Sequence, residues 1–110
     1  MNNGAVRYQR DGLVARITFD RPEARNAMTW TMYDQLGAAC DRVRADAEVR
    51  AVVFRGTGGK AFVAGTDIGQ FLDFNSGEDG VNYERRMAVY LAAVEALPVP
   101  TLAVIEGWAI

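Results

Sequence analysis

VRAVVFRGTGGKAFVAGTDI, residues 49–68, decides the fold of this chain. Its first part, 49–55, is apolar and rich in β-branched residues, which is typical of a buried strand. Residues 56–60 are polar and glycine-rich and are expected to form a turn. Residues 61–64 are again compact and apolar, and residues 65–72, which begin with glycine, are expected to open a short helix. A strand that continues through a turn into a helix is typical of α/β folds.

The residues before this stretch predict a hairpin. Residues 6–9 and 13–20 are expected to be two strands joined by Asp11-Gly12, a dipeptide that tolerates the positive φ of a tight turn. The second strand has the alternating pattern of a half-buried strand. Its predicted buried set is Leu13, Ala15, Ile17 and Phe19.

A helix is predicted over residues 29–45, with Thr29 as the N-cap because its hydroxyl can accept an unpaired backbone N–H. Apolar residues recur at three- and four-residue steps and define one buried face. These residues are Met32, Tyr33, Leu36, Ala39, Cys40 and Val43.

The last part of the chain repeats the alternation of helix and strand. Residues 75–80 have the composition of a loop, and 81–97 predict a second helix that ends before two prolines. Its predicted apolar face contains Tyr83, Met87, Tyr90, Leu91 and Val94. Residues 101–105 predict another strand. This order indicates the α/β class, with a mostly parallel sheet and flanking helices.

Composition excludes several kinds of protein. The 110 residues contain no histidine, which removes Ser-His-Asp and Cys-His catalysis and the commonest zinc ligand, so no metal site is expected. The single cysteine, Cys40, cannot form an internal disulfide, and this favours a cytoplasmic location. A net charge of −2 without a basic cluster argues against nucleic-acid binding, and no apolar run is long enough to span a membrane.

Two glycine-containing segments are candidates for anion binding. The turn at 56–60 lacks the spacing of a phosphate-binding loop, since Ala61 follows Lys60 and Phe54 stands where the first glycine belongs. It is therefore interpreted as a surface turn. At Gly65, backbone N–H groups at a helix start can stabilise an oxyanion, or the segment can be an ordinary turn.

Arg21 and Arg25 can contact a phosphate or can simply be solvated. Both interpretations stay open at the level of the residues alone, because exposed arginines near acids are common on protein surfaces.

Three blocks in series resemble the enoyl-CoA hydratase/isomerase (crotonase) family. They are R-P-E-A-R-N-A-M at 21–28, G-T-G-G-K-A-F-V-A-G-T-D-I at 56–68 and P-V-P-T-L-A-V-I-E-G-W-A-I at 98–110. The resemblance extends from about Leu13 to the last residue. It implies a crotonase-like ββα superhelix, of which residues 1–110 are the N-terminal part of a single domain that ends before the second oxyanion-hole glycine.

The resemblance also implies the substrate site. The first oxyanion donor of the family is the backbone N–H after the glycine of A-G-x-D, here Thr66 in place of the usual alanine. The carbonyl of Ala64 is implied to accept the adenine amino group, and Arg25 is implied to approach a CoA phosphate. The implied CoA-binding residues are Ala24, Arg25, Ala64, Gly65, Asp67 and Ile68.

The second donor of the family follows a lead-in that Gly107-Trp108-Ala109-Ile110 matches, and the acid/base carboxylates lie further along. Glu106 precedes the motif glycine and is interpreted as structural or interfacial. Residues 1–110 alone are therefore expected to be inactive.

The implied activity is hydration of a 2-enoyl-CoA in fatty acid metabolism, with the CoA thioester as substrate and no separate cofactor. Other crotonase chemistry, such as enoyl-CoA isomerisation or carnitinyl-CoA-type dehydration, is the alternative within the family. A non-catalytic binding or assembly module is the alternative of another class. The resemblance further implies a homo-oligomer, either a trimer or a dimer of trimers.

Overall fold

A hairpin and two further strands form the main sheet. The computed structural model describes residues 4–59, 61–63, 77–106, 108 and 109. Strands β1 (Ala5–Asp11) and β2 (Val14–Asp20) pair antiparallel, and Gly12 takes the positive φ of 62° that the turn requires. The predicted hairpin is therefore confirmed.

The rest of the main sheet is parallel. Strand β3 (Ala51–Gly56) pairs parallel with β2, and β5 (Thr101–Val104) pairs parallel with β3, so the strand order is β1-β2-β3-β5. The parallel pairings require crossover connections, which the helices supply. The predicted α/β class with a mostly parallel sheet is confirmed.

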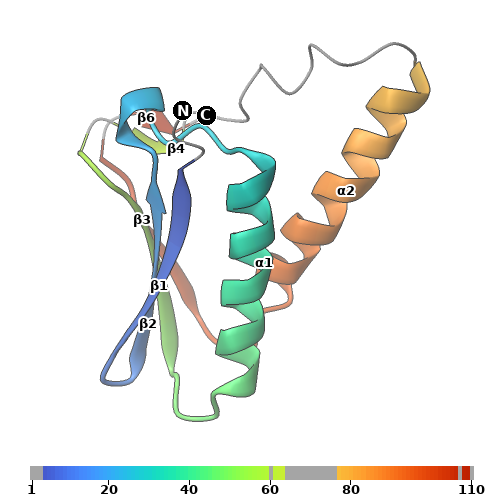
Figure 1. Cartoon of the computed structure of the whole chain (residues 1–110). Coiled ribbons are helices and arrows are strands. Elements are labelled where there is room, and N and C mark those ends of the chain that lie inside the picture. Colours follow the sequence, from blue (N-terminus) through green and yellow to red (C-terminus); the bar gives the residue numbers. More distant parts are fainter. Residues whose placement is uncertain (1–3, 60, 64–76, 107, 110) are drawn as a thin grey trace.

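Helix α1 (Trp30–Ala45) covers one face of this sheet (Figure 1). The Thr29 hydroxyl accepts a hydrogen bond from the Met32 backbone N–H at 3.2 Å, as predicted for an N-cap. All six residues of the predicted apolar face are buried. They pack against Ala15, Ile17 and Phe19 of β2 in one core. The prediction for Leu13 was wrong: it lies in the hairpin turn before β2 and is 55% exposed.

Helix α2 (Gly77–Glu95) packs on α1 and diverges from it toward its own amino end (Figure 1). The rings of Tyr33 and Tyr90 stack at 5.7 Å, and Tyr83 meets Trp30 edge-on at 5.2 Å. The Arg86 guanidinium lies 4.1 Å from the centre of the Trp30 ring, a cation–π contact. Aromatic packing thus holds the two helices together.

Two predictions near α2 were wrong. Residues 75–80 were expected to be a loop, but the helix already begins at Gly77. Each helical glycine costs about 1 kcal/mol relative to alanine, and a long helix with a packed stripe can absorb that cost. Leu91 was expected on the buried face and is 52% exposed, because the α1 side of α2 is formed by Tyr83, Met87 and Tyr90.

A small second sheet lies at the carboxyl ends of the parallel strands. Strand β4 (Ala61–Val63) pairs parallel with β6 (Trp108–Ala109), and the 3-10 turn η1 (Pro22–Ala24) lies at the same end (Figure 1). The short helix expected over 65–72 lies outside the described residues.

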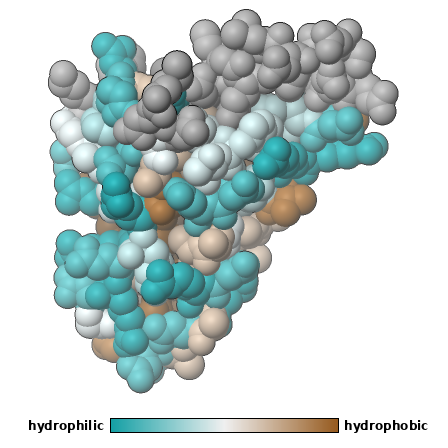
Figure 2. Space-filling model, in the orientation of Figure 1, coloured by the Kyte–Doolittle hydropathy of each residue, from teal (hydrophilic) through white to brown (hydrophobic). Residues whose placement is uncertain are grey.

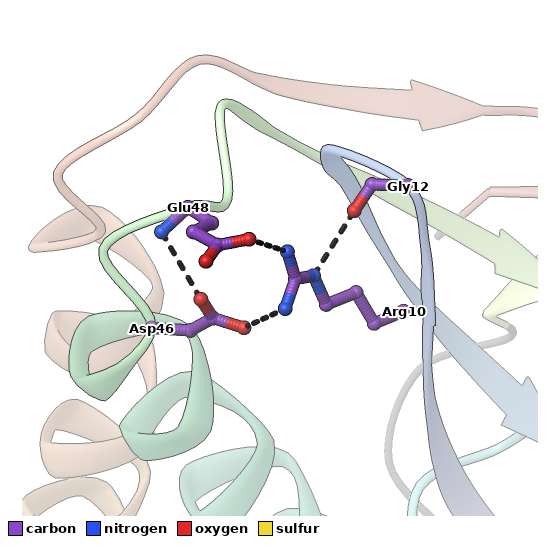
Figure 3. Close-up of polar contacts among 4 residues, drawn as sticks. All are labelled: Arg10, Gly12, Asp46 and Glu48. Carbon is purple, nitrogen blue, oxygen red and sulfur yellow. Dashed lines mark hydrogen bonds and ion pairs between the residues drawn. The ribbon is translucent and has the colours of Figure 1, made fainter.

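The opposite end of the sheet is tied by charged side chains (Figure 3). The guanidinium of Arg10, at the end of β1, lies 3.1 Å from the carboxylate of Asp46 and 2.7 Å from that of Glu48. Both acidic residues are in the connection between α1 and β3. Its Nε donates to the carbonyl of Gly12 in the hairpin turn at 3.0 Å. We call these four residues the Arg10 clamp.

Several apolar side chains are exposed at the surface. All four residues of β5 are exposed, including Leu102 at 58%, and Val89 of α2 is 66% exposed. Figure 2 shows apolar patches among hydrophilic side chains on the helical side of the molecule. Among the described residues, no helix is long and apolar enough to cross a membrane.

Candidate functional site

The loop after β2 has a closed conformation. Pro22 begins η1, where its missing N–H costs no hydrogen bond. Arg25 and Asn26 then both adopt left-handed backbone conformations, with φ of 52° and 60°. The Asn26 N–H donates to the Arg21 carbonyl at 2.8 Å, and the Arg21 N–H donates back to Asn26 Oδ1 at 2.8 Å. This reciprocal pair fixes the loop that carries Ala24 and Arg25.

Asn26 joins this loop to the connection between β3 and β4. Its side chain is fully buried, and Nδ2 donates to the carbonyls of Thr57 and Ala61, both at 3.0 Å. With the bond from Arg21, three of its four side-chain hydrogen-bonding positions are used. Asn26 was not predicted as a site residue. The quoted block R-P-x-x-x-N-A-M contained it, but its role depends on contacts with residues more than thirty positions away.

The β3–β4 turn fits closely against the same loop. A Cβ added to Gly56 would lie 2.4 Å from the carbonyl oxygens of Ala61 and Phe62. Such a distance is not compatible with any side chain at this position. A Cβ on Gly58, which has a φ of 94°, would meet Pro22 of η1 at 3.2 Å. The prediction that this segment is a turn and not a phosphate-binding loop is confirmed over residues 57–59, since strand β4 and not a helix follows.

Strands β4 and β6 bring two distant parts of the chain together. Ala61 is the partner of Trp108, and Val63 is the partner of Ala109, in a parallel pairing whose register shifts by one residue between the two pairs. Residues that follow two adjacent parallel strands emerge at one edge of the sheet. The predicted site residues Ala64, Gly65, Thr66, Asp67 and Ile68 follow β4 and lie outside the described residues.

The structure therefore brings together parts of the first two sequence blocks. The loop of Ala24 and Arg25 packs against the connection into β4, through Asn26 and Pro22. Ala24 is half-buried and Arg25 is exposed. Arg21 differs from Arg25, because its guanidinium donates to the Ala27 carbonyl at 3.3 Å and helps to close the loop.

Glu106 lies beside the same turn. Its carboxylate is 3.7 Å from the Arg55 guanidinium, and a Cβ on Gly59 would come within 3.3 Å of it. The side chain is half exposed and paired with a cation across the strands, which agrees with its interpretation as structural.

Side chains that act as nucleophiles or metal ligands contribute little here. Cys40 is fully buried within the core, and burial raises the pKa of its thiol, so the reactive thiolate is disfavoured. Within the described ranges, no group of three or more cysteine, aspartate or glutamate residues is arranged to hold a metal ion. Among the described residues, this end of the sheet offers backbone amides and carbonyls, the Arg25 guanidinium and the carboxylates of Glu23 and Glu106.

With this geometry established, comparison with known proteins defines the class. A profile of the enoyl-CoA hydratase/isomerase family matches residues 9–110. The chain belongs to this family, and its fold is crotonase-like.

Individual relatives are similar over nearly the whole chain. A probable enoyl-CoA hydratase of Rhodobacter capsulatus is 35% identical and covers 97% of this chain. The short-chain-enoyl-CoA hydratase of Clostridium acetobutylicum is 32% identical over the full 110 residues. The matched region is 40% and 41% of these relatives, respectively, so the chain spans about two fifths of their length.

Solved structures agree with the fold. The crystal structure of an enoyl-CoA hydratase/carnithine racemase from Magnetospirillum magneticum superposes with a TM-score of 0.86 at 35% identity. The match covers 97% of this chain and 40% of that one. An enoyl-CoA hydratase/isomerase from Xanthobacter autotrophicus gives a TM-score of 0.85 at 33% identity, covering 93% of this chain and 38% of that one.

Proposed function

We propose that this chain contributes the first half of an acyl-CoA site that hydrates a 2-enoyl-CoA. The observation that carries the proposal is the parallel pairing of β4 with β6, together with the loop of Ala24 and Arg25 packed against the entry to β4. Family membership supports the acyl-CoA class, and relatives named as enoyl-CoA hydratases support hydration.

The reaction requires stabilisation of negative charge. When water adds to an enoyl thioester, charge accumulates on the thioester oxygen as an enolate forms. In the proposed site the backbone N–H of Thr66 donates to that oxygen, and a second amide, in the segment that follows the β6 lead-in in this family, completes the pair. In other enzymes, removing one such donor raises the activation barrier by about 3 kcal/mol.

The nucleotide end of the substrate is assigned to the η1 loop. We propose that Arg25, exposed beside the half-buried Ala24, contacts a CoA phosphate, and that the Ala64 carbonyl accepts the adenine amino group. Gly65, Asp67 and Ile68 are proposed to line the same site. No cofactor besides the CoA thioester is part of this proposal.

Binding is the direct test, because residues 1–110 acting alone are expected not to turn substrate over. Calorimetric titration of the chain with crotonyl-CoA should show saturable binding. Affinity for 3′-dephospho-CoA should be lower than for CoA in the wild-type chain. The Arg25→Met variant should lose that difference if Arg25 contacts the 3′-phosphate. A chain that binds no acyl-CoA would overturn the proposal.

The oxyanion role of Thr66 has its own test. Acetoacetyl-CoA enolises readily, and its bound enolate is visible by near-ultraviolet absorbance. Thr66→Pro removes the backbone N–H and should lower the enolate fraction of the bound ligand, whereas Thr66→Ala keeps the N–H and should preserve it. Equal enolate fractions in both variants would refute the assigned role.

Isomerisation remains the second candidate, since the family description names both hydratases and isomerases and one structural neighbour is named a racemase. The relative binding affinities of 2-enoyl and 3-enoyl thioesters distinguish the two.

Assembly into a homo-oligomer is also proposed, supported by the exposed apolar residues of β5 and α2. Light scattering of the purified chain measures it. A monodisperse 12 kDa monomer that binds no acyl-CoA would favour the non-catalytic module instead.

A further inference from the structure

Asn26 makes contacts that exceed the needs of a simple turn. The side chain is fully buried, and each of its two amide hydrogens has a carbonyl acceptor, one on Thr57 and one on Ala61. Its Oδ1 accepts from the Arg21 N–H. The three partners lie on three different segments: the end of β2, the β3–β4 turn and the first residue of β4.

Asparagine is the residue that satisfies all of these contacts at once. The backbone φ is 60°, which asparagine tolerates better than most residues with a side chain. Aspartate is nearly isosteric but has no donor when ionised, so it would face two carbonyl oxygens with negative charge. Glycine accepts the backbone angle but leaves the Thr57 and Ala61 carbonyls and the Arg21 N–H without their partner.

The neighbouring contacts leave little freedom around this side chain. A Cβ on Gly56 would lie 2.6 Å from Asn26 Nδ2, and Pro22 packs against Gly58 on the other side. Hydrogen bonds and close contacts therefore join the η1 loop, the turn and β4.

We propose that Asn26 is a positioning residue that sets the distance between the two ends of the acyl-CoA site. This inference rests on the proposed function. The loop of Ala24 and Arg25 carries the proposed phosphate contact, and the residues proposed to contact the adenine and the thioester, Ala64 and Thr66, follow β4 in the sequence. Asn26 links the loop to β4 and touches no substrate itself. Without this link, the loop and the segment after β4 would no longer be held at the separation that one substrate molecule requires.

The test compares a whole substrate with half of one. Crotonyl-pantetheine lacks the nucleotide, so the ratio of its Kd to that of crotonyl-CoA measures what the nucleotide end adds. In Asn26→Asp this gain should fall about tenfold, which corresponds to the loss of one well-placed interaction. Asn26→Gly removes the side chain and tolerates the positive φ. It should give the same fall, and it is a second variant in case Asn26→Asp does not fold.

The matched control is Gln35→Ala. Gln35 is also an amide whose Oε1 accepts a backbone N–H, that of Val6 at 2.6 Å, but this bond joins β1 to α1 and not the η1 loop to β4. The Gln35→Ala variant should have a lower melting temperature than the wild type and the same nucleotide gain. A merely structural Asn26 would behave in the same way.

The outcomes separate this inference from the proposed function. If the wild-type chain binds both ligands and folded Asn26 variants keep the full nucleotide gain, the positioning role is wrong and the proposed function stands. If the wild-type chain binds neither ligand, the proposed function fails and the positioning role fails with it. Even without ligand binding, hydrogen exchange tests whether Asn26 links the η1 loop to β4. In Asn26→Gly, backbone amides within 21–27 and 57–63 should exchange faster together, and in Gln35→Ala they should not.

Discussion

At each end of the main sheet one side chain joins several segments of the chain, and these two side chains differ in kind. At the hairpin end, Arg10 reaches Asp46, Glu48 and the Gly12 carbonyl from the surface (Figure 3). At the opposite end, Asn26 makes three hydrogen bonds from within the protein. The first is charged and partly exposed to solvent, and the second is neutral and fully buried.

Burial decides how much the contacts of each side chain contribute to stability. The Arg10 side chain is 35% exposed and Glu48 is 74% exposed, so water and salt screen their attraction. The hydrogen bond to Glu48 raises the pKa of Arg10, so its charge persists, but charge alone adds little at a surface. Removing a buried partner leaves polar groups without hydrogen bonds, which is costly. The end that carries the proposed site is the end held by buried contacts.

The largest effect is expected from Gly56→Ala. The new methyl would overlap two backbone carbonyls and Asn26 Nδ2, none of which can move without opening the β3–β4 turn. We expect a loss of more than about 3 kcal/mol in the free energy of unfolding, measured with urea.

Gly12→Ala is the matched control at the hairpin end. Its Cβ would meet nothing within 4 Å, although its φ of 62° is unfavourable for alanine. The expected loss is about 1 kcal/mol, from backbone strain alone. Equal losses for the two glycines would mean that the crowding at Gly56 does not matter.

The next effect is expected from Asn26→Gly. It removes the three side-chain hydrogen bonds while keeping the backbone angle accessible, so the loss should be about 2–3 kcal/mol by urea unfolding. Asn26→Ala should lose about 1 kcal/mol more, since alanine adds left-handed strain. If Asn26→Gly were as stable as the wild type, water would have to replace all three bonds.

A smaller effect is expected from Thr29→Ala, at the same end of the sheet. The hydroxyl satisfies one N–H at the start of α1, and its loss should cost about 1 kcal/mol. Thr29→Ser keeps the hydroxyl and should retain most of the wild-type stability; both variants are measured by urea unfolding. Alanine and serine variants of equal stability would argue against the cap.

The smallest effect is expected from Arg10→Met. Methionine keeps an unbranched apolar chain and removes the charge, so the urea midpoint should change less than in Thr29→Ala. Any difference from the wild type should vanish in 1 M salt, where the screening length is about 3 Å. A large loss that persists in high salt would show that the Arg10 clamp acts through packing.

Much of the fold could be predicted because it depends on local pattern. The spacing from Met32 to Val43 specifies a helix face, and Asp11-Gly12 specifies a hairpin turn, without knowledge of the rest of the chain. Errors arose where the environment and not the pattern decides. Leu91 fits the helical period but faces solvent, and Gly77 lies in a helix although glycine is a poor helix former.

The site was predictable only in part. Sequence blocks marked Arg25 and the turn after β3, and the structure shows that their segments touch. Asn26 was missed, because a buried amide and an exposed one look alike in a sequence. Its importance arises from the carbonyls of Thr57 and Ala61, whose positions depend on the tertiary fold.

The pairing of β4 with β6 has a consequence for the order of folding. Hairpin strands β1 and β2 close over a two-residue turn, whereas residue 61 must find residue 108 across nearly half of the chain. Closing so long a loop costs conformational entropy before any contact stabilises it. The hairpin end should therefore assemble early and the β4–β6 end late. The same order predicts that, in native-state exchange, amides of β4 open at lower free energy than those of β2.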